Sequence, residues 1–100
     1  MKLIAMEIEN VGVTAEQFEP HLIEEARTVW GLQQQGLIRE VYFREDQHTA
    51  VLILECEDVS HAQSVLALLP LVRHALIHFD IIPLAPYSGY SRLFVSSGKT

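Results

Sequence analysis

The sequence predicts a single α+β domain in which two helices cover one side of a four-stranded antiparallel sheet. Four short apolar runs have the length and residue types of strands: 2–8, 37–44, 49–56 and 76–84. Apolar residues with helical spacing occupy two of the intervals between them, 14–36 and 58–69. The chain has 100 residues, of which 49% are hydrophobic, so we expect one domain with its own core.

The first helix is expected to begin in two steps. Thr14 and Gln17 have the spacing of a capping box, which marks a helix start. Pro20 has no backbone N–H to donate, so a short first turn should precede a longer helix that ends at Gly36. The stripe expected to face the core consists of Phe18, Leu22, Ala26, Val29 and Gln33, with Trp30 beside it in the core. The outer face is expected to carry Glu16, Glu19, Glu24, Glu25 and Arg27.

The second half of the chain repeats the strand–helix–strand order. The polar residues 45–48 suit a hairpin between the second and third strands. Asp58 is a good N-cap for the second helix, and Pro70 is expected to end that helix. Its core stripe consists of Ala62, Val65, Leu66 and Leu69. The two halves, 1–44 and 49–84, together follow the ferredoxin-like βαββαβ plan.

The C-terminal residues divide into two parts. Tyr87, Tyr90, Leu93 and Phe94 are apolar groups that a free tail would not need. We therefore expect the single domain to comprise 1–94, with this segment packed on a surface of the chain or of a neighbouring subunit. Residues 95–100 are expected to form a flexible C-terminal tail.

Charge and cysteine content exclude several function classes. The net charge is −6, from 13 acidic and 7 basic residues, which argues against a nucleic-acid partner. The basic residues are scattered, and no apolar run is long enough to span a bilayer, so we expect no membrane partner and a cytoplasmic location. Cys56 is the only cysteine and is expected to be a small buried hydrophobe. Neither a metal-ligand spacing nor a glycine-rich phosphate loop occurs, so no metal or cofactor is expected.

The third strand is apolar at nearly every position, which is typical of a strand covered on both faces. Alternation places Ile4, Met6 and Ile8 against the helices. The opposite face is then expected to carry Glu7, Glu40, Tyr42, Glu55, His78 and Asp80 among Leu3, Ala5, Val51, Ile53, Leu76 and Ile82. A face of this mixed kind suits packing against the sheet of a second copy, which would form a barrel across a homodimer.

The polar groups of that second face are the candidate site. His78 and Asp80 are expected to act as an acid/base pair with Glu40 as a second carboxyl, because buried carboxyls and histidines can titrate near neutrality. The residues expected to bind a small-molecule substrate are Tyr42, Arg73, His74 and Glu7, with Arg73 as the partner of an anionic group. Alternatively, these residues line a rim with no chemistry.

Part of the chain resembles the muconolactone isomerase family of the dimeric α+β barrel superfamily. The residues that carry the resemblance are GLIREVYFRED at 36–46, Glu55, Leu69-Pro70-Leu71, Asp80 and Pro86. The resemblance implies a homodimer or larger ring. It also implies a cofactor-independent proton shift that moves a double bond in a small unsaturated lactone carrying a carboxylate. A non-catalytic ligand-binding module and an oligomerisation module remain the alternatives, because one fold hosts many functions.

Overall fold

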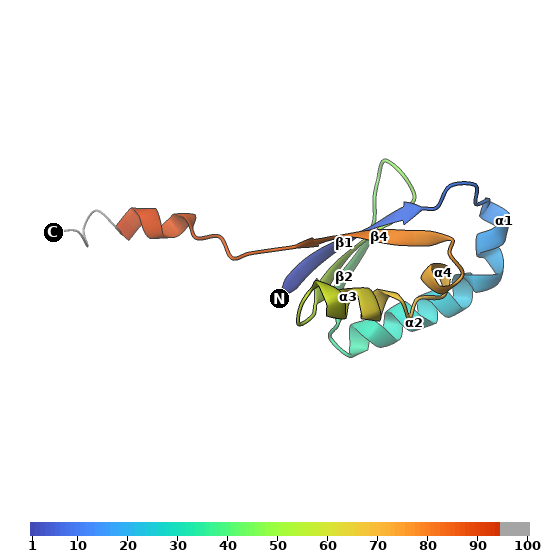
Figure 1. Cartoon of the computed structure of the whole chain (residues 1–100), viewed down its shortest axis with the longest axis horizontal. Helices are drawn as coiled ribbons and strands as arrows, with labels where there is room; N and C mark the ends of the chain where they lie inside the picture. Colours follow the sequence, from blue (N-terminus) through green and yellow to red (C-terminus); the bar gives the residue numbers. More distant parts are fainter. Residues whose placement is uncertain (95–100) are drawn as a thin grey trace.

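The computed structural model describes residues 1–94; the predicted flexible tail, 95–100, lies outside the described residues. The elements in chain order are β1 Lys2–Glu9, α1 Ala15–Phe18, η1 Glu19–His21, α2 Leu22–Gln34, β2 Ile38–Phe43, β3 Ala50–Glu55, α3 Val59–Leu66, α4 Pro70–Arg73, β4 Ile77–Pro83 and η2 Gly89–Ser91. The strands form one antiparallel sheet in the order β2-β3-β1-β4, with α2, α3 and α4 on one side (Figure 1). The predicted α+β fold is confirmed, and its arrangement is compatible with the ferredoxin-like plan.

Local sequence signals explain most of the helix boundaries. The Gln17 side chain accepts a hydrogen bond from the Thr14 N–H at 2.8 Å, and Pro20 lies in the 3-10 turn between α1 and α2. Gly36 ends α2 with a φ of +80°, a left-handed conformation that glycine adopts without strain. The Asp58 carboxylate accepts from the His61 N–H at 2.7 Å and caps α3.

The predicted role of Pro70 is wrong. Helix α3 already ends at Leu66, and Pro70 instead begins the short helix α4. A proline is well suited to the first position of a helix, because the N–H that it lacks would have no helical partner there.

The predicted faces are correct for three strands and wrong for β1. Leu3 pairs with Leu54 and Ala5 with Leu52, and all four side chains are buried under the helices. Ile4, Met6 and Ile8 therefore lie on the opposite, open face, and Glu7 lies on the helix side. Leu76 precedes β4 and is buried in a small cluster with Leu71 and Ile77, so it does not belong to the open face either. The sequence was misleading because the open face is itself apolar, so hydrophobicity could not tell the two sides of β1 apart.

The main core lies between the sheet and the helices α2 and α3. Its members are the buried residues Leu3, Ala5, Leu32, Ile38, Leu52, Leu54, Cys56, Ala62, Val65, Leu66 and Leu69. Cys56 is buried as predicted. Trp30, predicted to be in the core, is instead 61% exposed.

The open face of the sheet has an apolar centre with polar groups at its margins. Across the strands, Glu40 pairs with Ile53, Ile53 with Ile4, and Ile4 with Ile82. In the next row Tyr42, Val51, Met6 and Asp80 follow one another in the same way. A β-bulge between Ile38 and Glu40 shifts the alternation of β2, so that Ile38 lies on the helix side with Leu54 and Glu40, two residues later, lies on the open face with Ile53. No helix of the described chain covers this face (Figure 1).

The segment after β4 leaves the domain instead of packing on it. The Leu84 N–H still bonds the Lys2 carbonyl at 2.9 Å, after which the chain runs outward to the short turn η2 (Figure 1). We call residues 84–94 the C-terminal arm. The radius of gyration is 17.5 Å, whereas a compact domain of this length has about 13 Å, and the arm accounts for the difference.

Candidate functional site

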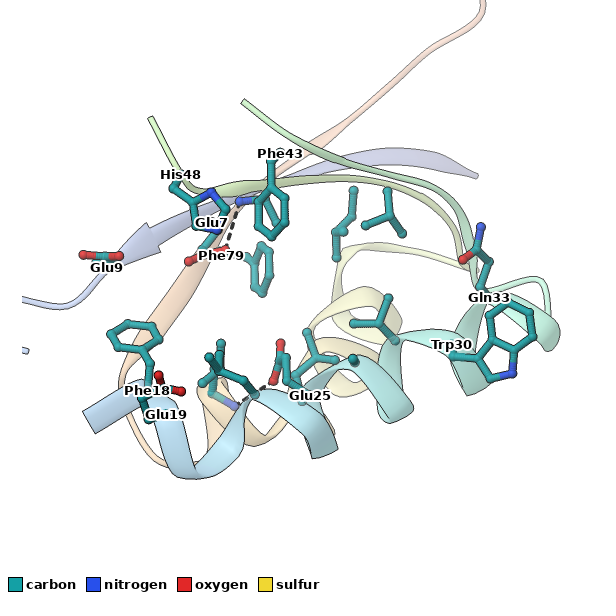
Figure 2. Close-up of a pocket in the computed structure, with 18 of the residues that line it drawn as sticks. Glu7, Glu9, Phe18, Glu19, Glu25, Trp30, Gln33, Phe43, His48 and Phe79 are labelled. Atoms are coloured by element: carbon teal, nitrogen blue, oxygen red, sulfur yellow. Dashed lines mark hydrogen bonds between the residues drawn. The ribbon is translucent and has the colours of Figure 1, made fainter. Parts of the chain in front are cut away.

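A cavity of about 750 Å³ lies between α2 and the sheet (Figure 2). β1, β2, β3 and the β2–β3 hairpin supply one wall, and α1, η1 and α2 supply the other. Leu69, Leu71 of α4 and Phe79 of β4 complete it. The lining is mainly apolar and aromatic, with a few carboxyl groups and one histidine. Its size and character are typical of a site for a small, largely apolar molecule.

The cavity exists because α2 does not close onto β2. Trp30 and Leu22 on the helix and Phe43 and Val41 on the strand all line it, and all four remain exposed to solvent. Side chains that met across this gap would be buried. Large apolar groups left open around a concave surface indicate a place that another molecule covers.

Glu7 projects from β1 into this cavity (Figure 2). One carboxylate oxygen, Oε1, accepts a hydrogen bond from the Ala50 N–H at 2.9 Å. Burial raises the pKa of Glu7; the Ala50 hydrogen bond and the charge of His48 oppose that rise, and Glu9 adds to it. Glu7 is therefore a fixed carboxyl that keeps its proton more readily than an exposed one.

Glu25 faces the same cavity from α2 (Figure 2). Its Oε1 accepts from the Leu71 N–H at 2.9 Å, which ties the helix to the start of α4. Burial raises the pKa of Glu25, and the charge of Glu7 raises it further, while the Leu71 hydrogen bond and Arg73 lower it. The prediction that Glu25 lies on the outer face of the helix is wrong.

Each of these carboxyls uses one oxygen for the backbone bond. Within residues 1–94, no hydrogen bond involves the Oε2 atom of Glu7 or of Glu25. The His48 ring lies at the same wall, stacked on Phe43 with a centroid distance of 4.1 Å. The cavity thus offers two carboxyls and an imidazole to a bound molecule, which are the groups that proton transfer requires.

The charged residues that line the cavity are all acidic. Glu7, Glu9, Glu19 and Glu25 line the cavity, and the lining residues include neither lysine nor arginine. Within the described chain, neither Glu9 nor Glu19 forms an ion pair. The potential in and around the cavity is therefore negative at neutral pH, which disfavours an anionic group deep inside it.

The predicted catalytic residues lie elsewhere, on the open face. The Tyr42 hydroxyl donates to Glu40 Oε1 at 2.5 Å, and this bond raises the pKa of Tyr42. His78 Nδ1 is paired with Asn10 Oδ1 at 2.5 Å rather than with Asp80. Asp80 lines a second hollow of about 440 Å³ at the hairpin end of the sheet, which shares Glu7, Glu9 and His48 with the helix–sheet cavity. All four side chains are exposed in the single chain.

Arg73 and His74 lie at the end of α4, and neither lines the cavity. Arg73 is exposed and acts on Glu25 only through its charge. The His74 ring stacks on His21 at a centroid distance of 4.1 Å. Of the seven predicted site residues, the structure thus brings only Glu7 into the helix–sheet cavity.

Sequence reasoning missed Glu25 and His48. Glu25 lies between Leu22 and Val29 at helical spacing, so a carboxyl within the apolar stripe was a signal available in the sequence. His48 offered none, because its position depends on how the hairpin curls over Phe43.

Neither a membrane span nor a metal cluster is found in the part of the chain that the structure describes. None of its helices is long and apolar enough to cross a bilayer. Among residues 1–94, no three His, Cys, Asp or Glu side chains are grouped so that they could hold a metal ion.

No model of a known protein family matches this sequence, and no curated protein matches it. The class of protein is therefore defined by the structure alone: an α+β domain with an apolar, carboxylate-bearing cavity between its sheet and its helices.

The raised pKa values of Glu7 and Glu25 predict how stability changes with pH. Their ordinary pKa is 4.5 and the folded state raises it, so the stabilising contribution is complete below pH 4.5. That contribution is lost as the pH rises through the folded pKa, because the ionised form is then poorly solvated. Glu25→Gln keeps the acceptor for Leu71 and removes the charge. Its Tm should exceed that of the wild type by about 2–4 °C at pH 7, a small effect because both groups are partly exposed to water.

Thermal unfolding followed from pH 3.5 to 8 checks this prediction. The two curves should meet at the acidic end. As a control, Glu57→Gln changes a carboxyl that is 86% exposed and should follow the wild type throughout. The opposite result would be a Glu25→Gln variant whose Tm lies below that of the wild type at pH 7 but not at pH 4. It would mean that the folded state favours the ionised form of Glu25, which contradicts the prediction.

Proposed function

We propose that the protein is a cofactor-independent enzyme of the muconolactone isomerase type, which moves a proton within a small unsaturated or lactone-type molecule held in the helix–sheet cavity. One observation carries the proposal: two carboxyls with raised pKa values, Glu7 and Glu25, face one apolar cavity. Desolvated acid and base groups in a cavity are a common arrangement for proton transfer.

The geometry suggests a role for each carboxyl. Glu7, as a carboxylate, removes a proton from a carbon conjugated with the lactone carbonyl, which leaves a dienolate. Burial and the charge of Glu7 both raise the pKa of Glu25, and in its protonated form Glu25 returns a proton at the other end of the dienolate. The double bond has then moved, one proton has been taken and one given, and no co-reactant is consumed.

The acidic lining constrains how an anionic substrate could bind. A carboxylate on the lactone would meet Glu7 and Glu25 if it entered the cavity first. It must therefore remain at the mouth, where solvent or a cation from outside the lining can balance its charge.

Two copies are proposed to pack through their open sheet faces as a homodimeric barrel. The apolar centre, Ile4, Met6, Val51 and Ile53, is only half-buried in the single chain, and burying it would stabilise a dimer. In such a barrel Glu40, Tyr42, His78 and Asp80 would become enclosed, so they form a rival catalytic site. The helix–sheet cavity is favoured because its walls exist within one chain.

A non-catalytic binding module is the second candidate, since an apolar cavity holds a ligand with or without turnover. Deuterium exchange separates the two. The protein is incubated in D₂O with an unsubstituted β,γ-unsaturated five-membered lactone and with the same lactone carrying a carboxymethyl group. The enzyme should speed deuterium incorporation and double-bond migration well above the buffer rate. A raised Tm without any exchange would support the binding module, and no effect of either kind would contradict both.

A further inference from the structure

The C-terminal arm carries apolar side chains that the domain does not use. Tyr87, Tyr90 and Leu93 are 73%, 69% and 70% exposed. The rings of Tyr87 and Tyr90 meet edge to face at a centroid distance of 4.9 Å, so the arm presents a small preformed aromatic surface. Tyrosine and leucine side chains displayed together in this way are typical of a surface that contacts a protein.

We propose that the arm of one copy covers the mouth of the helix–sheet cavity of a second copy, so that the site is completed across the dimer. The inference depends on the cavity and the arm and not on turnover by the protein.

Charge and apolar character match the arm to this cavity mouth. Between Ile81 and Thr100 the sequence has no acidic residue, and the arm contains Arg92. The cavity is lined by four glutamates and lacks lysine and arginine, and its exposed apolar groups include Trp30 and Phe43. A cationic aromatic segment is therefore complementary to an apolar hollow whose lining carries only negative charge. Arg92 would also bring to the mouth the cation that an anionic lactone needs.

The sheet order directs the arm to another copy rather than to its own cavity. The arm follows β4, whereas the exposed cavity residues Val41 and Phe43 belong to β2, at the opposite edge of the sheet. Pro83 and Pro86 fix their own φ angles and favour extended residues before them. The chain consequently continues the direction of β4 away from the domain (Figure 1).

Reach and symmetry also permit a reciprocal exchange. Five extended residues and one short helical turn span about 25 Å, and the domain is 28 × 21 Å across its two shorter axes. Across the sheet, Pro83 pairs with Leu3, Leu3 with Leu54, and Leu54 with Ile38. The arm therefore begins at the same level of the sheet as β2. The C-terminal end of α2, which carries Trp30, directly precedes β2 in the sequence. The origin of the arm and the Trp30 end of the cavity thus lie at one end of the sheet, which suits a two-fold contact in which each copy covers the other.

Trp30 is the single tryptophan of the chain and reports on this contact. It lines one end of the cavity (Figure 2) and is 61% exposed when no arm covers it. Docking should shift the fluorescence emission of the wild type to shorter wavelength than that of an arm variant, Tyr90→Ser with Leu93→Ser. The matched control is Val11→Ser, which removes a fully exposed apolar group in a turn and should leave the emission unchanged.

Mixing the arm variant with a non-fluorescent partner tests docking between copies. The partner is Trp30→Phe, which has an intact arm and contributes no tryptophan signal. Excess partner should restore the blue-shifted emission of the arm variant as subunits exchange. A partner that combines Trp30→Phe with both arm substitutions should not restore it. If the wild type and the arm variant emit alike, or if the intact partner fails to restore the shift, the proposal is wrong.

Discussion

Leu54→Ala should lower the free energy of unfolding by about 2–5 kcal/mol, the cost typical of truncating a fully buried leucine. Leu54 lies in the inner strand β3, has no exposed surface and belongs to the main core. Its neighbours Leu3 and Ile38 pair with it from both sides, so the backbone cannot collapse into the space left behind. Denaturant unfolding at low protein concentration measures the loss.

The adjacent residue provides the control. Ile53 has a similar size but lies on the open face, where it is half-buried. Ile53→Ala should cost about 1 kcal/mol or less in the single chain, because little of its apolar surface is removed from water. Equal losses for the two variants at a concentration where the protein is monomeric would contradict the assignment of faces.

Glu7→Gln should reduce kcat for the lactone double-bond shift by about 10²- to 10⁴-fold, the range typical of losing a general base. The amide keeps the size of the side chain and the acceptor for the Ala50 N–H, but it cannot remove a proton. The same substitution removes a poorly solvated charge, so the Tm at pH 7 should not fall. Lost turnover without lost stability distinguishes a catalytic role from a structural one.

Glu40→Gln tests the rival site on the open face. If chemistry takes place in the helix–sheet cavity, this variant should retain kcat within about twofold. If instead Glu40→Gln lost most of its kcat while Glu7→Gln kept normal turnover, the reaction would take place inside the barrel between the two sheets.

Most of the fold could be predicted because local signals and periodicity agreed. Gly36, Asp58 and the Thr14–Gln17 spacing each marked a helix end that the structure confirms. The faces of β2, β3 and β4 followed from alternation. Polar residues mark the open side of β2 and β4, and Glu55 marks it at the end of the otherwise apolar β3.

The position of the site could not be predicted in the same way. In β1 both faces are apolar, so the sequence alone could not show that Glu7 lies under the helices. Trp30 has the spacing of a core residue and becomes exposed only because α2 stands away from β2, which is a property of tertiary packing. A carboxyl in an apolar helical stripe, as at Glu25, is the pattern that would have indicated the correct side.

Backbone and indole NMR shifts on addition of the unsubstituted unsaturated lactone test the central claim most directly, because they locate the ligand without requiring turnover. Binding in the helix–sheet cavity predicts the largest changes at Glu7, Glu25, Ala50 and the Trp30 indole N–H, with the open face nearly unchanged. Changes concentrated at Glu40, Tyr42, His78 and Asp80, with a silent Trp30, would contradict it.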